Sequence, residues 1–224
     1  MSTRSTSLRA KPSNPSRAKS RGRSGRRSTR RQAWRRRAAL LVAAALAGLL
    51  VFAAISPFLD KAVQEISLPL RHEDIIRQQA ADKNLDPALI AGVIYTESRF
   101  RDQTSPAGAK GLMQILPSTA DYIARKSGGT AFEQGDLASP QINIAYGSYF
   151  LRYLIDHYDG HEPLAIAAYN AGLGNVDEWV AEAGGSEDFD LDVDIPFPET
   201  RAYVRNVLER RSEYREHYAD ELGL

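Results

Sequence analysis

The sequence predicts an all-α fold, on two observations. Apolar residues recur at helical spacing over long stretches, whereas the strict alternation of a β-strand is nearly absent. Twice, a helix-capping residue is followed by proline, at Asp86-Pro87 and Ser139-Pro140, which is typical of helix N-termini. The 224 residues leave room for one domain of about 150 residues plus an appendage, and no internal repeat is visible.

The helices of the domain are expected where the apolar spacing is helical and capping residues or glycines mark the ends. These stretches are 72–84, 86–97, 117–128, 139–154, 162–171, 175–183 and 200–218. Residues 99–110 and the acidic segment 184–194 contain glycine and polar residues, so we expect loops there.

The charges are segregated along the chain, although the formal net charge is only +1. Residues 1–37 contain 14 Lys or Arg and no Asp or Glu, whereas the remainder has 15 Lys or Arg against 28 Asp or Glu. The basic arm, 1–37, has few apolar residues and is expected to be disordered. Such an arm could bind nucleic acid. Because it runs directly into an apolar segment, we predict a topological role and no nucleic-acid partner.

Residues 38–55 form an uncharged apolar run, which would span about 27 Å as a helix and cross a membrane. Three arginines precede the run and acidic residues follow it, so the N-terminus should be cytoplasmic and the acidic domain extracytoplasmic. A cleaved signal peptide is the alternative, but 37 residues before the run are long for one. A buried soluble helix is disfavoured because the run is apolar on every face. We predict an uncleaved, single-pass signal anchor, a linker at 56–70 and the domain at 71–224.

The chain contains no cysteine, which excludes disulfides, thiol chemistry and Cys-based zinc sites. Of the four histidines, His157 and His161 have helical i, i+4 spacing, but Asp159-Gly160 between them is typical of a turn. We predict no metal site and no cofactor.

Glu97 is the candidate catalytic residue. Leu89, Ile90, Val93 and Ile94 recur at helical spacing, and Glu97 falls on the same face. A carboxyl group on a core-facing stripe is desolvated, which favours its protonated form and suits it to donate a proton. The alternative is a glutamate at a helix end in a surface ion pair.

Four sequence blocks carry a resemblance to a known family. They are Glu-Ser-Arg-Phe at 97–100, Gly-Ala-Lys-Gly-Leu-Met-Gln-Ile-Leu-Pro at 108–117, Ala-Ala-Tyr-Asn-Ala-Gly at 167–172 and Ile-Pro-Phe-Pro-Glu-Thr-Arg-Ala-Tyr-Val at 195–204. In this order and separation they resemble the soluble-lytic-transglycosylase-like catalytic domain, glycoside hydrolase family 23, over residues 70–218. The resemblance implies an all-α, lysozyme-like fold similar to goose-type lysozyme.

The resemblance also implies an activity on peptidoglycan glycan strands. In this family the residue matching Glu97 protonates the oxygen that bridges N-acetylmuramic acid and N-acetylglucosamine. It then acts as base on the C6 hydroxyl, so that a 1,6-anhydro ring forms without water. The substrate-binding residues that the resemblance implies are Tyr169, Gln114, Glu199, Asn170, Ser105, Ser98 and Gly111.

Structural alternatives stand beside several of these assignments. Ser98 can bond to backbone as a helix-terminal hydroxyl, and Gly111 can serve turn geometry alone. Tyr169, whose hydroxyl the resemblance places beside Glu97, can be a core residue, and Glu199 can complement a helix dipole. Tyr203 is expected to pack inward.

Two other activities remain open at the level of sequence. A muramidase would use the same acid but consume water, and an inactive peptidoglycan-binding module would keep the fold without the reaction. The sequence predicts the membrane and the glycan strands as partners and gives no oligomeric state.

Overall fold

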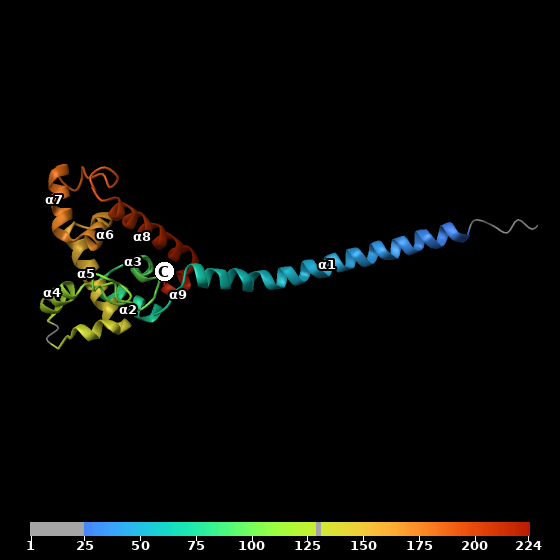
Figure 1. The fold of residues 1–224 in the computed structure, drawn as a ribbon, viewed down its shortest axis with the longest axis horizontal. Helices are drawn as coiled ribbons and strands as arrows, with labels where there is room; N and C mark the ends of the chain where they lie inside the picture. The colour runs from blue at the N-terminus through green and yellow to red at the C-terminus, as the bar shows by residue number, and fades with distance from the viewer. Residues whose placement is uncertain (1–24, 129–130) are drawn as a thin grey trace, which may run out of the picture. The chain divides into compact units, whose positions relative to one another are not determined.

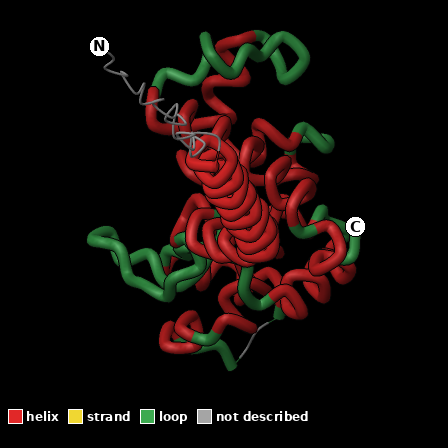
Figure 2. Tube along the Cα trace, turned by 90° about the vertical axis from the view of Figure 1, so that its right-hand side faces the viewer, coloured by secondary structure: helices red, strands yellow, loops and turns green. Residues whose placement is uncertain are grey.

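The computed structural model describes residues 25–128 and 131–224. The chain divides into two units, Met1–Leu59 and Asp60–Leu224. Residues 1–24, most of the basic arm, lie outside the described residues. Among the described residues the regular structure is helical, and the only β-type pairings are two isolated bridges, Thr104 with Lys110 and Lys110 with Ile115 (Figure 2).

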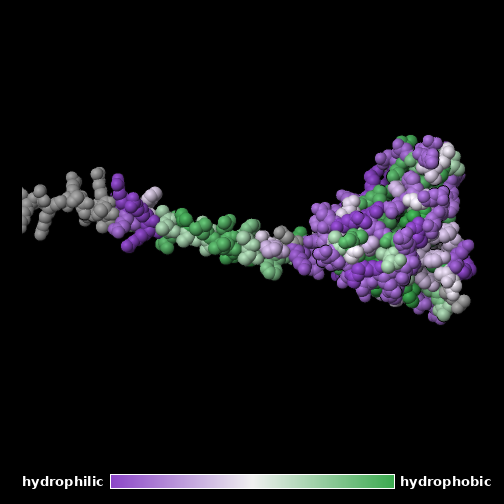
Figure 3. Space-filling view, turned by 180° about the vertical axis from the view of Figure 1, so that it is seen from behind, coloured by the Kyte–Doolittle hydropathy of each residue, from purple (hydrophilic) through white to green (hydrophobic). Residues whose placement is uncertain are grey.

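Helix α1 (Gly25–Ser67) makes up the described part of the first unit and continues into the second. Residues 25–37 belong to this helix, whereas the sequence predicts disorder over the whole arm. Arginine, glutamine and alanine are good helix formers, and extending an existing helix adds one hydrogen bond for each residue fixed. The apolar stretch follows the basic one along α1 (Figure 3), and its large apolar side chains are exposed. By length and composition α1 is able to cross a membrane.

Helix α1 also runs through Pro57, so the predicted linker at 56–70 is irregular only at 68–72. Proline has no N–H to donate to the carbonyl four residues earlier, which is that of Ala53. The Ser56 hydroxyl donates to this carbonyl instead, at 3.4 Å. The Ala53 carbonyl thus has a side-chain donor within reach, and α1 continues past Pro57 to Ser67.

The second unit contains eight further α-helices and one 3₁₀ turn among the described residues (Figure 1). They are α2 (Glu73–Lys83), α3 (Pro87–Ser98), α4 (Pro117–Ser127), η1 (Gln134–Ala138), α5 (Pro140–His157), α6 (Glu162–Ala171), α7 (Leu173–Ala183), α8 (Pro198–His217) and α9 (Ala219–Leu222). The all-α prediction is confirmed. Asp86 caps α3 as expected, because its Oδ1 accepts a hydrogen bond from the Ala88 N–H at 3.0 Å.

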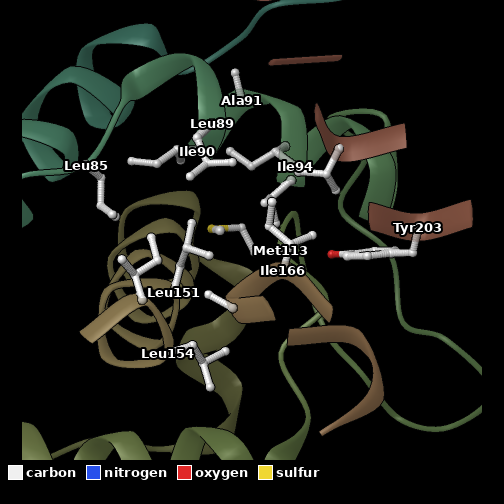
Figure 4. Close-up of a cluster of buried hydrophobic side chains, with 14 of the residues drawn as sticks. Leu85, Leu89, Ile90, Ala91, Ile94, Met113, Leu151, Leu154, Ile166 and Tyr203 are labelled. Carbon is white, nitrogen blue, oxygen red and sulfur yellow. The ribbon is translucent and has the colours of Figure 1, made fainter. Parts of the chain in front are cut away.

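Helix α3 is the central helix of the core. Its residues from Ala88 to Ile94 are all buried, and Leu89, Ile90 and Ile94 face Met113 and residues of α5 and α6 (Figure 4). A helix that is apolar all round is stable only when other elements cover every side. Glu97, one turn beyond Ile94, therefore lies at the end of a helix whose residues Ala88–Ile94 are all buried.

Helix α3 packs along α8, and Gly92 makes their close approach possible. A Cβ atom at Gly92 would lie 2.9 Å from the carbonyl oxygen of Val207. The two helices run antiparallel, so residues after Gly92 face residues before Val207. This register brings Glu97 opposite Tyr203.

Candidate active site

Glu97 is held in a desolvated position at the C-terminal end of α3. Tyr203 donates a hydrogen bond from its hydroxyl to Glu97 Oε1, with an O···O distance of 2.6 Å. Burial raises the pKa of Glu97 from its ordinary 4.5 to about 7, and the hydrogen bond from Tyr203 offsets part of this rise. Near neutral pH the protonated and ionised forms are therefore both populated, as acid–base catalysis requires.

The structure assigns to Tyr203 the contact that the sequence analysis expected of Tyr169. Tyr203 is buried, as predicted, but its hydroxyl reaches Glu97 as well as packing. The sequence did offer one indication of this contact, because the hydroxyl of a buried tyrosine usually has a hydrogen-bond partner. Apolar spacing alone could not show that this partner is a residue 106 positions earlier.

Tyr169 lies near Glu97 but does not bond to it. Its hydroxyl donates to the Met113 carbonyl at 3.0 Å. Burial is the main cause that raises the pKa of Tyr169, and the charge of Glu97 raises it further. Tyr169 therefore stays protonated, and it fixes the 108–117 loop against α6.

Ser98 bonds to backbone atoms, which is the structural alternative given for it above. Its hydroxyl is placed to donate to the Leu112 carbonyl at 2.7 Å and to the Ile94 carbonyl at 3.1 Å. Both acceptors are backbone atoms, and Ser98 is buried. Ser98 thus ties the end of α3 to the loop and does not contact the Glu97 carboxyl group through its hydroxyl.

Asn143 on α5 is a residue of the site that sequence reasoning missed. Its Oδ1 accepts from the Met113 N–H at 2.8 Å, and its Nδ2 donates to the carbonyls of Lys110 and Leu137 at 2.9 and 3.0 Å. Gly111 lies against it, since a Cβ there would be 2.1 Å from Asn143 Nδ2. Gly111 is therefore required by this close approach and by its positive φ of 76°.

Gln114 and Ser105 shape the same loop. Gln114 has a positive φ of 47°, and its Nε2 donates to the carbonyls of Gly111 and Gln103 at 2.8 and 3.0 Å. Its Oε1 accepts no hydrogen bond from the residues that the structure describes. Ser105 Oγ accepts from the Ala109 N–H at 3.1 Å and closes a tight turn.

Asn170 and Glu199 lie together at a hollow of about 340 Å³ formed by the end of α6 and the start of α8. Asn170 Oδ1 accepts from the Thr200 hydroxyl at 2.9 Å, and both Asn170 and Glu199 are exposed. Thr200 is buried and one helical turn before Tyr203, so the hollow adjoins the Glu97 region through α8. Asn170 and Glu199 are therefore both accessible to a ligand.

His157 and His161, which have i, i+4 spacing in the sequence, bond to different partners. His157 Nε2 lies 2.8 Å from Asp177 Oδ1, whereas His161 Nδ1 accepts from the Leu164 N–H at the start of α6. Within residues 25–128 and 131–224, no three His, Asp or Glu side chains come together as a metal site.

A partly buried carboxyl group with a pKa of about 7, bonded to a buried tyrosine on an all-α scaffold, defines an acid–base enzyme site. Residues 74–191, more than half of the chain, match the family model described as "Transglycosylase SLT domain". The chain belongs to this family.

The relatives and solved structures agree with this family. The soluble lytic murein transglycosylase of Escherichia coli K12 is 33% identical over 159 residues, which cover 70% of this chain and 25% of that protein. The membrane-bound lytic murein transglycosylase C of Glaesserella parasuis is 38% identical over 116 residues, covering 47% of this chain and 32% of that one. The chain thus spans a quarter to a third of the length of these curated relatives.

The 70 kDa soluble lytic transglycosylase of Escherichia coli superposes with a TM-score of 0.64 at 32% identity, covering 70% of this chain and 26% of that one. An inactive glutamate-to-glutamine mutant of the Pseudomonas aeruginosa lytic transglycosylase Slt gives a TM-score of 0.62 at 33% identity, covering 68% and 25%. The predicted lysozyme-like lytic transglycosylase fold is confirmed.

Replacing Tyr203 with phenylalanine should raise the pKa of Glu97 further, because the lost hydrogen bond stabilises the ionised form. The alkaline limb of the pH–rate profile should move up by about half a pH unit or more, and the maximal rate should fall several-fold. Tyr218→Phe is the matched control, because the Tyr218 hydroxyl donates to the Leu68 carbonyl and not to Glu97. An unchanged profile in Tyr203→Phe would contradict this coupling.

Proposed function

We propose that this protein is a membrane-anchored murein lytic transglycosylase with Glu97 as its catalytic acid and base. It cleaves the β-1,4 bond between N-acetylmuramic acid and N-acetylglucosamine. The observation that carries the proposal is the 2.6 Å contact of Tyr203 with Glu97, a carboxyl group whose pKa is about 7 and which lies within the residues that match the transglycosylase SLT domain.

The proposed reaction uses one carboxyl group twice. Glu97 donates its proton to the bridging oxygen, and the bond from this oxygen to C1 of the muramic residue breaks. The C6 hydroxyl of the same residue attacks C1, and its proton passes to the Glu97 carboxylate. The acid is regenerated and no water is consumed. A pKa near the working pH suits both steps.

The surroundings of Glu97 support a single-carboxylate reaction. The polar partner of its carboxyl group among the described residues is Tyr203, which burial and the Glu97 charge keep protonated. Asp102, the acid nearest to Glu97 in the sequence, is exposed in a loop. The tethered C6 hydroxyl has a high effective concentration, so it can compete with water at a site that excludes solvent.

We assign substrate binding to the residues around this carboxyl group. Asn170 and Glu199 flank the hollow between α6 and α8, and Oε1 of Gln114 is free to accept from a sugar N–H or hydroxyl. Four other residues contribute indirectly, because they position the 108–117 loop against which the glycan binds: Tyr169, Ser98, Ser105 and Gly111.

The product separates this reaction from a muramidase and from an inactive module. Digestion of purified glycan strands should give 1,6-anhydro ends, 18 mass units (about one water) lighter than hydrolysed ends. In heavy-oxygen water the new ends should carry no label by mass spectrometry. Stoichiometric label would make the protein a hydrolase, and the absence of any cleavage would make it a binding module.

The membrane anchor is the second part of the proposal. Support comes from the exposed apolar stretch of α1 and the arginines before it. A C-terminally tagged chain should fractionate at full length with the cytoplasmic membrane, and external protease should digest the domain in spheroplasts. A shortened, freely soluble form would instead show that the segment is removed as a signal peptide.

A further inference from the structure

A hollow of about 370 Å³ on the second unit is lined by three arginine side chains, Arg71, Arg99 and Arg101. It lies between the end of α1, the segment before α2 and the C-terminal end of α3. Tyr95 forms one wall, where its hydroxyl donates to the Ser67 carbonyl at 2.9 Å. The Arg99 guanidinium lies 5.7 Å from the centroid of the Tyr95 ring, close enough for a cation–π contact.

The three arginines have no acidic partner in the part of the chain that the structure describes. Other arginines of the same unit do pair with carboxylates: Arg152, Arg205, Arg210, Arg211 and Arg215. Glu65 lines the hollow too, but none of the ion pairs within 4.0 Å involves it. In an otherwise acidic domain, the hollow thus concentrates positive charge.

We propose that this hollow binds the phosphate group of an anionic phospholipid and docks the domain on the membrane surface. The proposal rests on the membrane anchor proposed above and concerns a site separate from Glu97. Arginine suits this ligand because its planar guanidinium donates paired hydrogen bonds to phosphate oxygens. Three unpaired guanidinium groups around one hollow repel one another, and a bound anion relieves that repulsion.

The rim of the hollow favours a lipid over a soluble anion. Ile66 lines it with 84% of its surface exposed, and Val63, one helical turn earlier, is 63% exposed. Exposed apolar side chains beside arginines match the junction of acyl chains and headgroups. An acidic peptide of the cell wall would find the arginines but no partner for these apolar groups.

The chain itself keeps the hollow close to the bilayer. Glu65 at the hollow is the tenth residue after Ile55, which ends the apolar run. Even if these ten steps of chain were fully extended, they would reach at most about 36 Å. The tether therefore holds the arginines at a high effective concentration of headgroups, so even a weak phosphate site would be occupied.

The test uses the full chain in lipid nanodiscs. The chain has no cysteine, so Asp102→Cys places one fluorophore beside Arg101 on an exposed loop. Quenching by nitroxide-labelled headgroups is compared in discs of phosphatidylcholine alone and discs that also contain phosphatidylglycerol. We expect at least about twofold more quenching with phosphatidylglycerol, and loss of this difference in Arg71→Gln/Arg101→Gln. Arg205→Gln, which removes an ion-paired surface arginine, should retain it.

The outcomes separate this site from the anchor. Protein that stays on phosphatidylcholine discs without lipid-dependent quenching overturns the phosphate site and keeps the anchor. Protein that binds only phosphatidylglycerol discs, with quenching lost in the double variant, keeps the site and overturns the anchor. A full response to inorganic phosphate or to an acidic peptide in phosphatidylcholine discs overturns the lipid assignment, and no binding to either disc overturns both proposals.

Discussion

Replacing Glu97 with glutamine should lower the rate of glycan cleavage by at least about 10²-fold while the domain remains folded. Glutamine keeps the size of the side chain and can still accept a hydrogen bond from the Tyr203 hydroxyl. It has no proton to give to the bridging oxygen and cannot take one from the C6 hydroxyl. Both proposed steps are lost, which explains the size of the effect.

The measurement is turnover of purified glycan strands by the variant and by a matched control. Glu178→Gln makes the same chemical change at an exposed position on α7 and should keep wild-type turnover. Near-normal turnover by a folded Glu97→Gln protein would remove Glu97 from the mechanism.

The Glu97→Gln variant should also be more stable than the wild type at alkaline pH. Because the folded-state pKa of Glu97 is about 7 against an ordinary 4.5, the folded state holds the extra proton between these values. The Glu97 contribution to stability is therefore fully present below about pH 4.5 and is lost as the pH rises through 7. Glutamine has no such loss, so its advantage should grow to about 3 kcal/mol by pH 8. Unfolding midpoints at pH 5 and pH 8 measure this difference.

Local features of the fold could be predicted from the sequence because they depend on neighbouring residues. The cap at Asp86 before Pro87 and the full extent of α6 (Glu162–Ala171) follow from spacing and capping chemistry. The continuation of α1 through Pro57 could not be predicted with the same rules. The carbonyl of Ala53, which loses its backbone donor at Pro57, lies 3.4 Å from the Ser56 hydroxyl, a contact that no spacing rule reports.

The position of Glu97 in the core could be predicted from the sequence, but its contacts could not. Glu97 follows from an apolar stripe within one helix. Its pairing with Tyr203 depends on how closely α3 approaches α8, which Gly92 permits and which no periodicity along the chain reports. The role of Asn143 could not be predicted either, because its three backbone partners lie in two segments distant from it in the sequence.

Asn143→Ala should destabilise the domain by about 3 kcal/mol or more and reduce glycan cleavage at least about tenfold. The side chain is fully buried, and its removal leaves the Met113 N–H and the carbonyls of Lys110 and Leu137 without their partner. Each unpaired buried group costs roughly 1–3 kcal/mol. The cavity that alanine leaves adds to this cost.

The loss of activity should follow from the loop and not from the acid. The carbonyl of Met113 holds the Tyr169 hydroxyl, and the carbonyl of Leu112 holds Ser98 beside Glu97. Without Asn143 the segment between these anchors is free to shift away from the end of α3. Asn175→Ala, which removes an exposed amide bonded to the Ala171 carbonyl, controls for the substitution itself. Wild-type stability and turnover in Asn143→Ala would contradict this prediction. The 108–117 loop would then be held in place by the turn that Ser105 closes and by the hydrogen bonds of the Gln114 amide.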